Sequence, residues 1–195
     1  QPAKSGLPAP DVSIVVPVRN EQDNVAPLIA EIAAALDGRW PYEIIYVNDG
    51  STDATGERLA AEMKARNNVR QIRHAASSGQ SAAVRTGVRA ARGKIVATLD
   101  GDGQNNPAFL VNLIEAIEKG GDKVGLAAGQ RVGRKDTGFK RFQSRAANGV
   151  RNAILHDGTR DTGCGLKAFR RDVFLALPYF DGLHRFLPAL VRREG

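Results

Sequence analysis

Two aspartates and a glutamine follow an apolar run near the middle of the chain. Asp100, Asp102 and Gln104 come directly after Ile95–Leu99, a run typical of a buried strand. Asp102 and Gln104 are two residues apart, so an extended backbone would point both side chains the same way. Carboxylate and amide oxygens are ligands that suit Mg²⁺ or Mn²⁺. The segment therefore predicts a divalent-metal site, and an ion there could neutralise a diphosphate.

Short apolar runs rich in β-branched residues alternate along the chain with segments of helical spacing. Residues 22–36 show the helical pattern, with Val25, Leu28, Ile29 and Ile32 on one face. This alternation predicts an α/β fold, a mostly parallel twisted sheet flanked by helices and joined by right-handed crossovers. The expected strands are 12–18, 42–47, 69–73, 94–99 and 123–128, and the expected helices are 22–36, a segment from the turn at 51–53 to about 66, 79–92 and 107–119.

Polar clusters follow three of the expected strands. They are residues 19–21, 48–49 and 100–104. Ligands of open parallel sheets gather beyond the carboxyl ends of the strands. The three clusters are therefore expected to converge on one edge of the sheet.

A basic segment follows the last expected strand. Residues 131–151 contain seven basic residues and one acid, which is +6 of the net charge of +7. Apolar residues recur at helical spacing between 139 and 154, so the segment is either a helix lying on anionic lipid or an ordinary amphipathic helix packed on the sheet. The charge implies an anionic partner such as phosphate, nucleic acid or acidic lipid; the alternative is a helix face whose charges are simply solvated.

Composition indicates one globular domain. The chain has 195 residues, 42% of them apolar and 25% charged. Residues 1–10 are expected to be a disordered leader before a single domain over 11–195, and no segment has the ~20 apolar residues of a spanning helix. Aromatic residues are only 6% of the chain, which argues against a nucleic-acid partner. Residues 16–20 lack the Gly-x-Gly-x-x-Gly pattern of a dinucleotide-binding fold.

Five segments carry a family resemblance that covers about residues 12–190. In this order they resemble the family 2 glycosyltransferases of GT-A fold, and most of all the polyprenyl-phosphate sugar transferases of the dolichol-phosphate mannose synthase type. Any one segment is a weak signal, but five in register are a strong one. The segments are VPVRNEQDNV at 16–25, YVNDGSTDAT at 46–55, SGQSAAVRTGVRAARG at 78–93, LDGDGQNNP at 99–107 and DTGCGLKAFRRDVF at 161–174.

The resemblance implies a nucleotide-sugar and metal half at 11–130, with a Rossmann-like arrangement. Glu21 would bond the ribose, Asp49 would accept from a ring N–H of the base, and Asp100 would face the nucleoside. Asp102 and Gln104 would hold Mg²⁺ or Mn²⁺. The catalytic candidates on this side are Asp100 and Asp102. The remaining implied donor contacts are Pro17, Arg19, Val47, Gln80, Gly101 and Arg131.

The resemblance also implies an acceptor-side half at 131–195, truncated before membrane segments that would lie beyond Gly195. The acceptor would be a polyprenyl phosphate such as dolichyl or undecaprenyl phosphate, reached at the cytoplasmic face of the membrane. The donor would be UDP- or GDP-linked, and transfer would invert the anomeric carbon. The residues implied for the lipid phosphate are Lys140, Arg141, Ser144 and Arg145.

Two other functions stay open at this point. The acceptor could be a hydroxyl of a glycan, in which case a carboxylate must take its proton and Asp161 is the candidate base. The chain could also be a nucleotide-sugar-binding module without catalysis. The oligomeric state is left open.

The chain departs from the family pattern at three positions. Gly101 and Gly103 stand where the aspartate motif usually has alanine and leucine, and Gln80 stands where a lysine is common. Glycine at both loop positions would loosen the loop unless the fold needs positive φ there.

Overall fold

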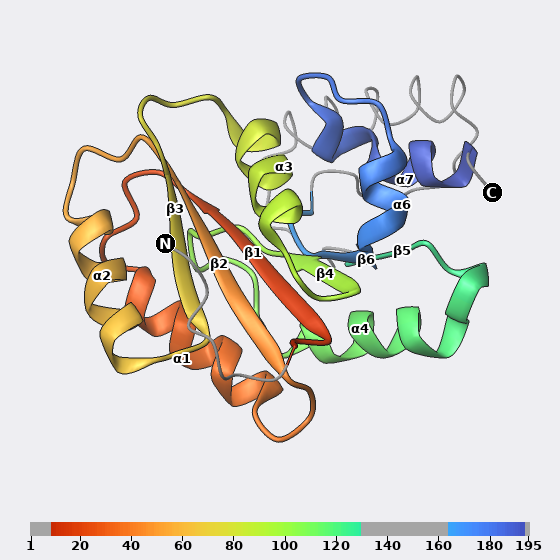
Figure 1. Ribbon diagram of the computed structural model, residues 1–195, viewed down its shortest axis with the longest axis horizontal. Helices are drawn as coiled ribbons and strands as arrows, with labels where there is room; N and C mark the ends of the chain where they lie inside the picture. The colour runs from red at the N-terminus through yellow and green to blue at the C-terminus, as the bar shows by residue number, and fades with distance from the viewer. Residues whose placement is uncertain (1–8, 130–163, 194–195) are drawn as a thin grey trace, which may run out of the picture.

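The structure, a computed structural model, describes residues 9–129 and 164–193. Their core is a six-stranded sheet with the order β3-β2-β1-β4-β6-β5 (Figure 1). The strands are β1 Val12–Val18, β2 Tyr42–Asp49, β3 Val69–His74, β4 Ile95–Thr98, β5 Leu126–Ala128 and β6 Lys167–Arg170. The helices are α1 Val25–Leu36, α2 Thr55–Ala65, α3 Gln80–Ala90, α4 Phe109–Gly120, the 3₁₀ turn η1 Gly121–Lys123, α6 Arg171–Ala176 and α7 Leu183–Arg193.

The first four strands pair in parallel, as predicted. Strand β1 lies between β2 and β4, with Val12 opposite Tyr42 on one side and Ile95 on the other. Helices cover both faces of this part of the sheet, so its strands need apolar side chains on both sides. That requirement explains why β1 and β2 read as continuous apolar runs.

The sheet differs from the prediction at β6. This strand was not expected, and it lies antiparallel between β4 and β5, so that the sheet is mixed. The strand was not predicted because the residues at its ends, Lys167 and Arg170, are charged. Its middle residues, Ala168 and Phe169, are both fully buried. Strand β5 therefore pairs with β6, while β4 gains its neighbour from a segment some 70 residues later in the chain.

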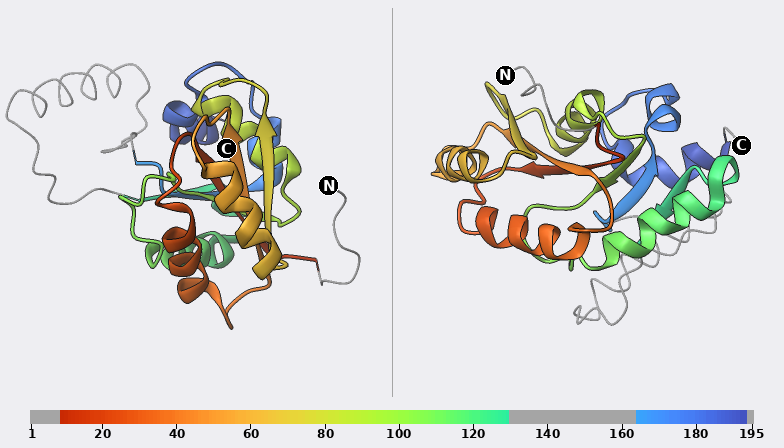
Figure 2. Two further views of the ribbon diagram at one scale, coloured as in Figure 1. Left: turned by 90° about the vertical axis from the view of Figure 1, so that its left-hand side faces the viewer. Right: turned by 60° about the horizontal axis from the view of Figure 1, so that its bottom comes forward.

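Two apolar layers enclose the sheet. Helices α1 and α4 cover one face, and α3, α6 and α7 cover the other (Figure 2). Strand β1 alternates between the layers, with Ile14 and Val16 facing α1 and Val15 facing α3. Gly87 lets α3 approach closely, since a Cβ there would lie 2.3 Å from Val15 Cγ1. The first turn of α3 is thereby fixed beside the carboxyl ends of the strands.

Helix α7 is attached to α3 through a serine and a histidine. Ser81 Oγ accepts a hydrogen bond from the backbone N–H of Gly182 (3.1 Å) and lies 2.6 Å from His184 Nδ1. A hydroxyl that accepts one hydrogen bond still has its own proton to donate, so Ser81 can serve both groups. Burial, then the positive charges of Arg185 and Lys167, lower the pKa of His184 to about 4, against a smaller opposing effect of Asp181. His184 is therefore neutral near pH 7.

The attachment of α7 should weaken in acid. The pKa of His184 is about 4 in the folded chain and about 6.5 when unfolded, so its contribution to stability is complete above pH 6.5 and is lost as the pH falls toward 4. We expect the Tm of the wild type to fall more steeply than that of His184→Gln between pH 7 and pH 4, because glutamine does not titrate. Parallel Tm curves for the two proteins would contradict this account of the contact.

Candidate functional site

The polar clusters that follow β1, β2 and β4 converge on one cleft, as the sequence predicted. The cleft has a volume of about 430 Å³ and lies at the carboxyl edge of the parallel strands. It also takes in the segment that follows β3. Its lining residues are Pro17, Val18, Arg19, Glu21, Asp49, Ser77, Gly79, Gln80, Ala83, Asp100, Gly101 and Asp102.

One of the predicted donor contacts, Val47, does not line the cleft. The Val47 side chain is fully buried in the apolar layer under α3, so it supports the end of β2 and does not line the cleft. Six of the predicted residues lie outside the described residues: Arg131, Lys140, Arg141, Ser144, Arg145 and Asp161.

The loop after β1 is bonded to the loop after β2. Asn20 has a φ of 57°, and its Oδ1 accepts a hydrogen bond from the backbone N–H of Thr52 at 2.8 Å. Its own N–H donates to Ser51 Oγ at 3.0 Å, and the N–H of Glu21 donates to Thr55 Oγ1 at 2.9 Å. Helix α1 begins at Val25, after this loop, and therefore later than its spacing predicted.

Asp49 joins the end of β2 to the segment after β3. Its Oδ1 accepts from His74 Nδ1 (2.7 Å) and from the backbone N–H of Ser78 (2.8 Å). Its Oδ2 accepts from Ser77 Oγ (2.8 Å) and from the backbone N–H of Gly79 (3.0 Å). Burial alone would raise the pKa of Asp49, but these hydrogen bonds outweigh it and lower the pKa below the usual value. Asp49 is therefore ionised at neutral pH.

Asp100 is paired with the residue that replaces the family's usual lysine. Gln80 Nε2 donates to Asp100 Oδ1 at 2.8 Å across the cleft. A Cβ on Gly165 would lie 2.1 Å from Asp100 Oδ2, so only glycine at position 165 leaves room for the carboxylate. Gln80 therefore orients the Asp100 carboxylate through a neutral amide.

The aspartate loop needs both of its glycines. Gly103 has a φ of +71°, in the left-handed region that favours glycine. A Cβ on Gly101 would lie 2.2 Å from Val18 Cγ1, so glycine there allows the loop to pack against the end of β1. The two departures from the family motif are thus explained by one positive φ and one close approach.

The prediction that Asp102 and Gln104 point the same way is wrong. The chain turns at residues 101–103, and the backbone N–H of Gln104 donates to Asp102 Oδ1 at 3.0 Å, which closes a local turn. Gln104 therefore lines a different hollow, beside Glu31 and Ala35 of α1. The alternation of side chains holds for an extended strand, and β4 ends at Thr98.

The residues of the cleft suit a weakly held divalent cation. Asp102 is exposed and lines the same cleft as Asp100. Among the described residues, no three His, Cys, Asp or Glu side chains gather into a complete metal cage. Mg²⁺ and Mn²⁺ are commonly bound by one or two carboxylates together with the phosphates of a substrate. The donor set fits a cation that arrives with a phosphate ligand.

Sequence reasoning named Gln80 in the segment after β3 but missed the other residues with which that segment forms the cleft. Ser77 and Gly79 line the cleft, and His74 supports it through Asp49. The signal was present, because His74 is the last residue of β3 and faces Asp49 in the parallel register. A polar residue at the carboxyl end of a third adjacent strand belongs to the same edge.

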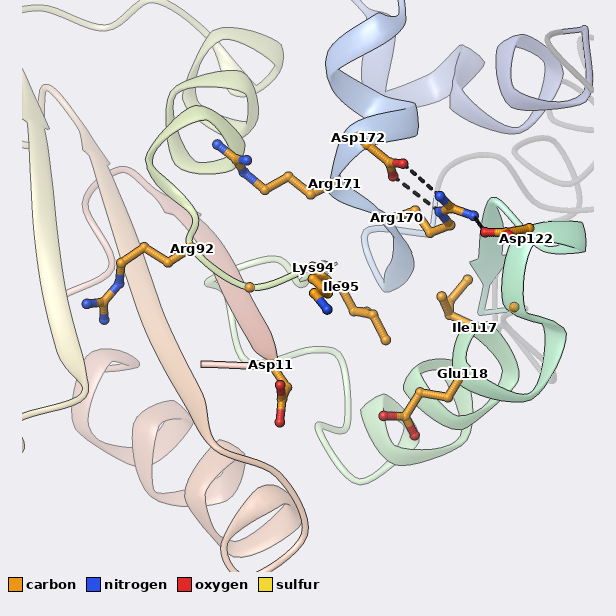
Figure 3. Close-up of a pocket in the computed structure, with 12 residues that line it drawn as sticks. Asp11, Arg92, Lys94, Ile95, Ile117, Glu118, Asp122, Arg170, Arg171 and Asp172 are labelled. Atoms are coloured by element: carbon orange, nitrogen blue, oxygen red, sulfur yellow. Dashed lines mark hydrogen bonds and ion pairs between the residues drawn. The ribbon is translucent and has the colours of Figure 1, made fainter. Parts of the chain in front are cut away.

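A larger hollow of about 590 Å³ lies at the opposite edge of the sheet, near the amino ends of β1 and β4 (Figure 3). Arg170 lies between Asp122 and Asp172 there, with Arg170 Nη2 2.7 Å from Asp172 Oδ2. Arg92, which also lines this hollow, pairs with Glu43, with 3.2 Å between Arg92 Nε and Glu43 Oε2. None of the residues predicted for the site lines it.

Solved structures show the same fold at low sequence identity. The mannosyltransferase PcManGT from Pyrobaculum calidifontis, in complex with GDP-Man and Mn²⁺, aligns with a TM-score of 0.65 and 22% identity over 88% of this chain and 47% of that one. Glucosyl-3-phosphoglycerate synthase from Mycobacterium tuberculosis, in complex with UDP, aligns with a TM-score of 0.68 and 22% identity over 87% and 60%. Both likenesses support the GT-A fold that the sequence predicted.

Curated relatives are more similar in sequence. The dodecaprenyl-phosphate galacturonate synthase of Rhizobium johnstonii is 36% identical over 93% of this chain and 54% of its own length. The undecaprenyl-phosphate 4-deoxy-4-formamido-L-arabinose transferase of Edwardsiella ictaluri is 36% identical over 92% and 55%. The chain thus spans about half the length of the curated relatives it matches. The model of the glycosyl transferase family 2 matches residues 13–177, and the chain belongs to that family.

Proposed function

We propose that the protein transfers a sugar from a nucleoside diphosphate sugar to a polyprenyl phosphate, and that the cleft described above binds this donor. The observation that carries this proposal is the convergence of Asp49, Asp100 and Asp102 on one cleft at the carboxyl edge of the sheet. The relatives named above use polyprenyl phosphates, and the solved neighbours bind GDP-Man or UDP, which agrees with such a donor.

The cleft has groups for each part of a donor. An ionised Asp49 can accept a hydrogen bond from a ring N–H of uracil or guanine, and Glu21 on the adjacent loop can accept one from a ribose hydroxyl. Asp100, oriented by Gln80, faces the middle of the cleft. Asp102 would hold Mg²⁺ or Mn²⁺ against the diphosphate, where the ion would supply Lewis-acid stabilisation of the leaving nucleoside diphosphate.

The acceptor phosphate needs no general base. It is already an anion, so one of its oxygens can attack the anomeric carbon as the bond to the nucleoside diphosphate breaks. Attack from the opposite side inverts that carbon. In this proposal Lys140, Arg141, Ser144 and Arg145 bind the acceptor phosphate, and Arg131 meets the donor phosphates.

The described part of the chain also has features that favour contact with an anionic membrane, at the cytoplasmic face in this proposal. Four of its large exposed apolar side chains lie in one short stretch, namely Leu175, Tyr179, Phe180 and Phe186. Helix α7 exposes Arg185, Arg192 and Arg193 beside them. Aromatic and basic side chains together suit the boundary between headgroups and acyl chains. No helix of the described residues is both long enough and apolar enough to span a bilayer.

Asp102→Ala should remove the gain in donor affinity that Mn²⁺ provides. The expected weakening is about tenfold or more, equivalent to at least ~1.4 kcal/mol. Calorimetric titration of UDP- and GDP-sugars with and without Mn²⁺ measures it. Asp23→Ala is the control, because Asp23 is exposed and does not line the cleft. Equal Mn²⁺-dependent affinity in Asp102→Ala and wild type would rule out this metal site.

Asp161→Asn tests the nature of the acceptor. If the nucleophile is a phosphate, the variant should keep most of its transfer rate, because no proton has to be removed. Transfer from a radiolabelled sugar nucleotide to undecaprenyl phosphate in detergent measures that rate. Loss of nearly all activity, about 10²-fold or more, would instead indicate a hydroxyl acceptor and a general base.

Replacing both Arg141 and Arg145 with alanine should weaken binding to vesicles that contain anionic lipid. Each basic residue near such a surface contributes about 1 kcal/mol, so we expect a loss of roughly tenfold or more at low salt. Because screening weakens the attraction, the wild type should also bind less as salt rises. Sedimentation with phosphatidylglycerol vesicles measures this, with pure phosphatidylcholine vesicles as the control. Unchanged sedimentation would show that Arg141 and Arg145 do not contribute to membrane binding.

A further inference from the structure

We infer that His74, supported by Thr86, positions Asp49 for recognition of the donor base, and that the Ser77 hydroxyl occupies the acceptor position on Asp49 that the base takes. The inference rests on the proposed donor site. It assigns roles to three side chains outside the residues that the sequence predicted for the site.

Asp49 has four donors around it, which is the full capacity of a carboxylate. Each carboxylate oxygen offers about two acceptor positions. His74 and the backbone N–H of Ser78 occupy those of Oδ1, while Ser77 Oγ and the backbone N–H of Gly79 occupy those of Oδ2. A ring N–H of a nucleobase can therefore reach Asp49 only by replacing or sharing one of these bonds.

Three of the four donors are fixed by the fold. The N–H groups of Ser78 and Gly79 belong to a backbone packed tightly against the end of β2, since a Cβ on Gly50 would lie 2.7 Å from the backbone N of Ser77. His74 is the Cα partner of Asp49 in the parallel register. Its side chain is only 16% exposed.

His74 is in turn held by α3. Its Nε2 lies 3.0 Å from Thr86 Oγ1, so the chain Asp49–His74–Thr86 connects β2, β3 and α3. A threonine hydroxyl can donate or accept, and it can therefore hold the ring in whichever protonation state His74 adopts. The ring is fixed at both nitrogens, which fixes the direction of the hydrogen bond that Asp49 receives.

The fourth donor can leave. Ser77 is exposed, lines the cleft, and reaches Oδ2 through a hydroxyl that can rotate about its Cβ–Oγ bond. A base N–H that takes its place on Oδ2 leaves this hydroxyl exposed to water. Ser77 thus competes with the base, whereas His74 assists it.

The two roles predict opposite effects on affinity. His74→Leu removes the bond to Asp49 Oδ1 and should weaken UDP or GDP binding roughly tenfold, because hydrogen bonds to charged groups are among the stronger ones. His74→Asn should restore most of the affinity, since its amide nitrogen can reach the position of Nδ1.

Ser77→Ala should bind the same nucleotide about two- to fivefold more tightly, because no hydroxyl is displaced. Ser77→Thr keeps the hydroxyl and should bind the nucleotide no more tightly than the wild type.

Two substitutions of Thr86 provide a matched test of its role. Thr86→Val keeps the shape but loses the hydroxyl, and it should weaken binding a few-fold. Thr86→Ser keeps the hydroxyl and should bind like the wild type. Equal affinities for Thr86→Val and Thr86→Ser would contradict the role of Thr86.

Calorimetry on the full chain with UDP, GDP and CDP, each with Mn²⁺, provides the test. Cytosine has no ring N–H, so the gain in Ser77→Ala should appear with the base that the wild type prefers, uracil or guanine, and not with CDP. A general loss of folding in His74→Leu would lower the affinities for all three nucleotides alike, and His74→Asn would show whether the bond itself is responsible.

The possible failures can be told apart. If the wild type binds none of the three nucleotides, the proposed donor site fails. If it binds UDP or GDP but the His74 and Ser77 variants bind with unchanged affinity, the donor site stands and this inference is overturned. An equal gain with CDP in Ser77→Ala would likewise overturn the competition between Ser77 and the base.

Discussion

Polar backbone groups at the carboxyl edge of a parallel sheet lack partners in the strand ladder and must find them in the loops. In this protein the four loops at that edge supply partners to one another. Asn20 bonds the first loop to the second, Asp49 bonds the second strand to the segment after the third, and Gln80 bonds that segment to Asp100. The shape of the cleft depends on these bonds, because they fix loops that would otherwise move independently.

The same bonds arrange negative charge before any ligand is present. Asp49 is kept ionised by its four donors, and Asp100 is oriented by a neutral amide. Asp102 remains exposed at a turn that Gly101 and Gly103 make possible. In the proposed reaction a carboxylate facing a diphosphate would repel it, so this arrangement suits a donor that arrives with a divalent cation.

The C-terminal segment is connected to the cleft through strand β6 and helix α7. Strand β6 enters the sheet next to β4, and its neighbour Gly165 leaves the space that the Asp100 carboxylate occupies. Helix α7 contacts α3 at Ser81, one residue after Gln80. In the proposed reaction, displacement of the C-terminal segment would therefore alter both the orientation of Asp100 and the first turn of α3.

The sequence by itself determined the parallel part of the sheet, its helices and the edge at which the polar clusters meet, because hydrophobic periodicity and the alternation of strands and helices along the chain are local properties. It also carried the family resemblance. The tertiary structure alone decided that Gln104 lies away from Asp102, that Lys167–Arg170 is a strand inside the sheet, and that Val47 is buried. It also decided that Asp49 is already surrounded by donors. Each of these depends on contacts between residues far apart in the chain, or on a turn whose direction is set by what packs against it, and no local pattern records such contacts.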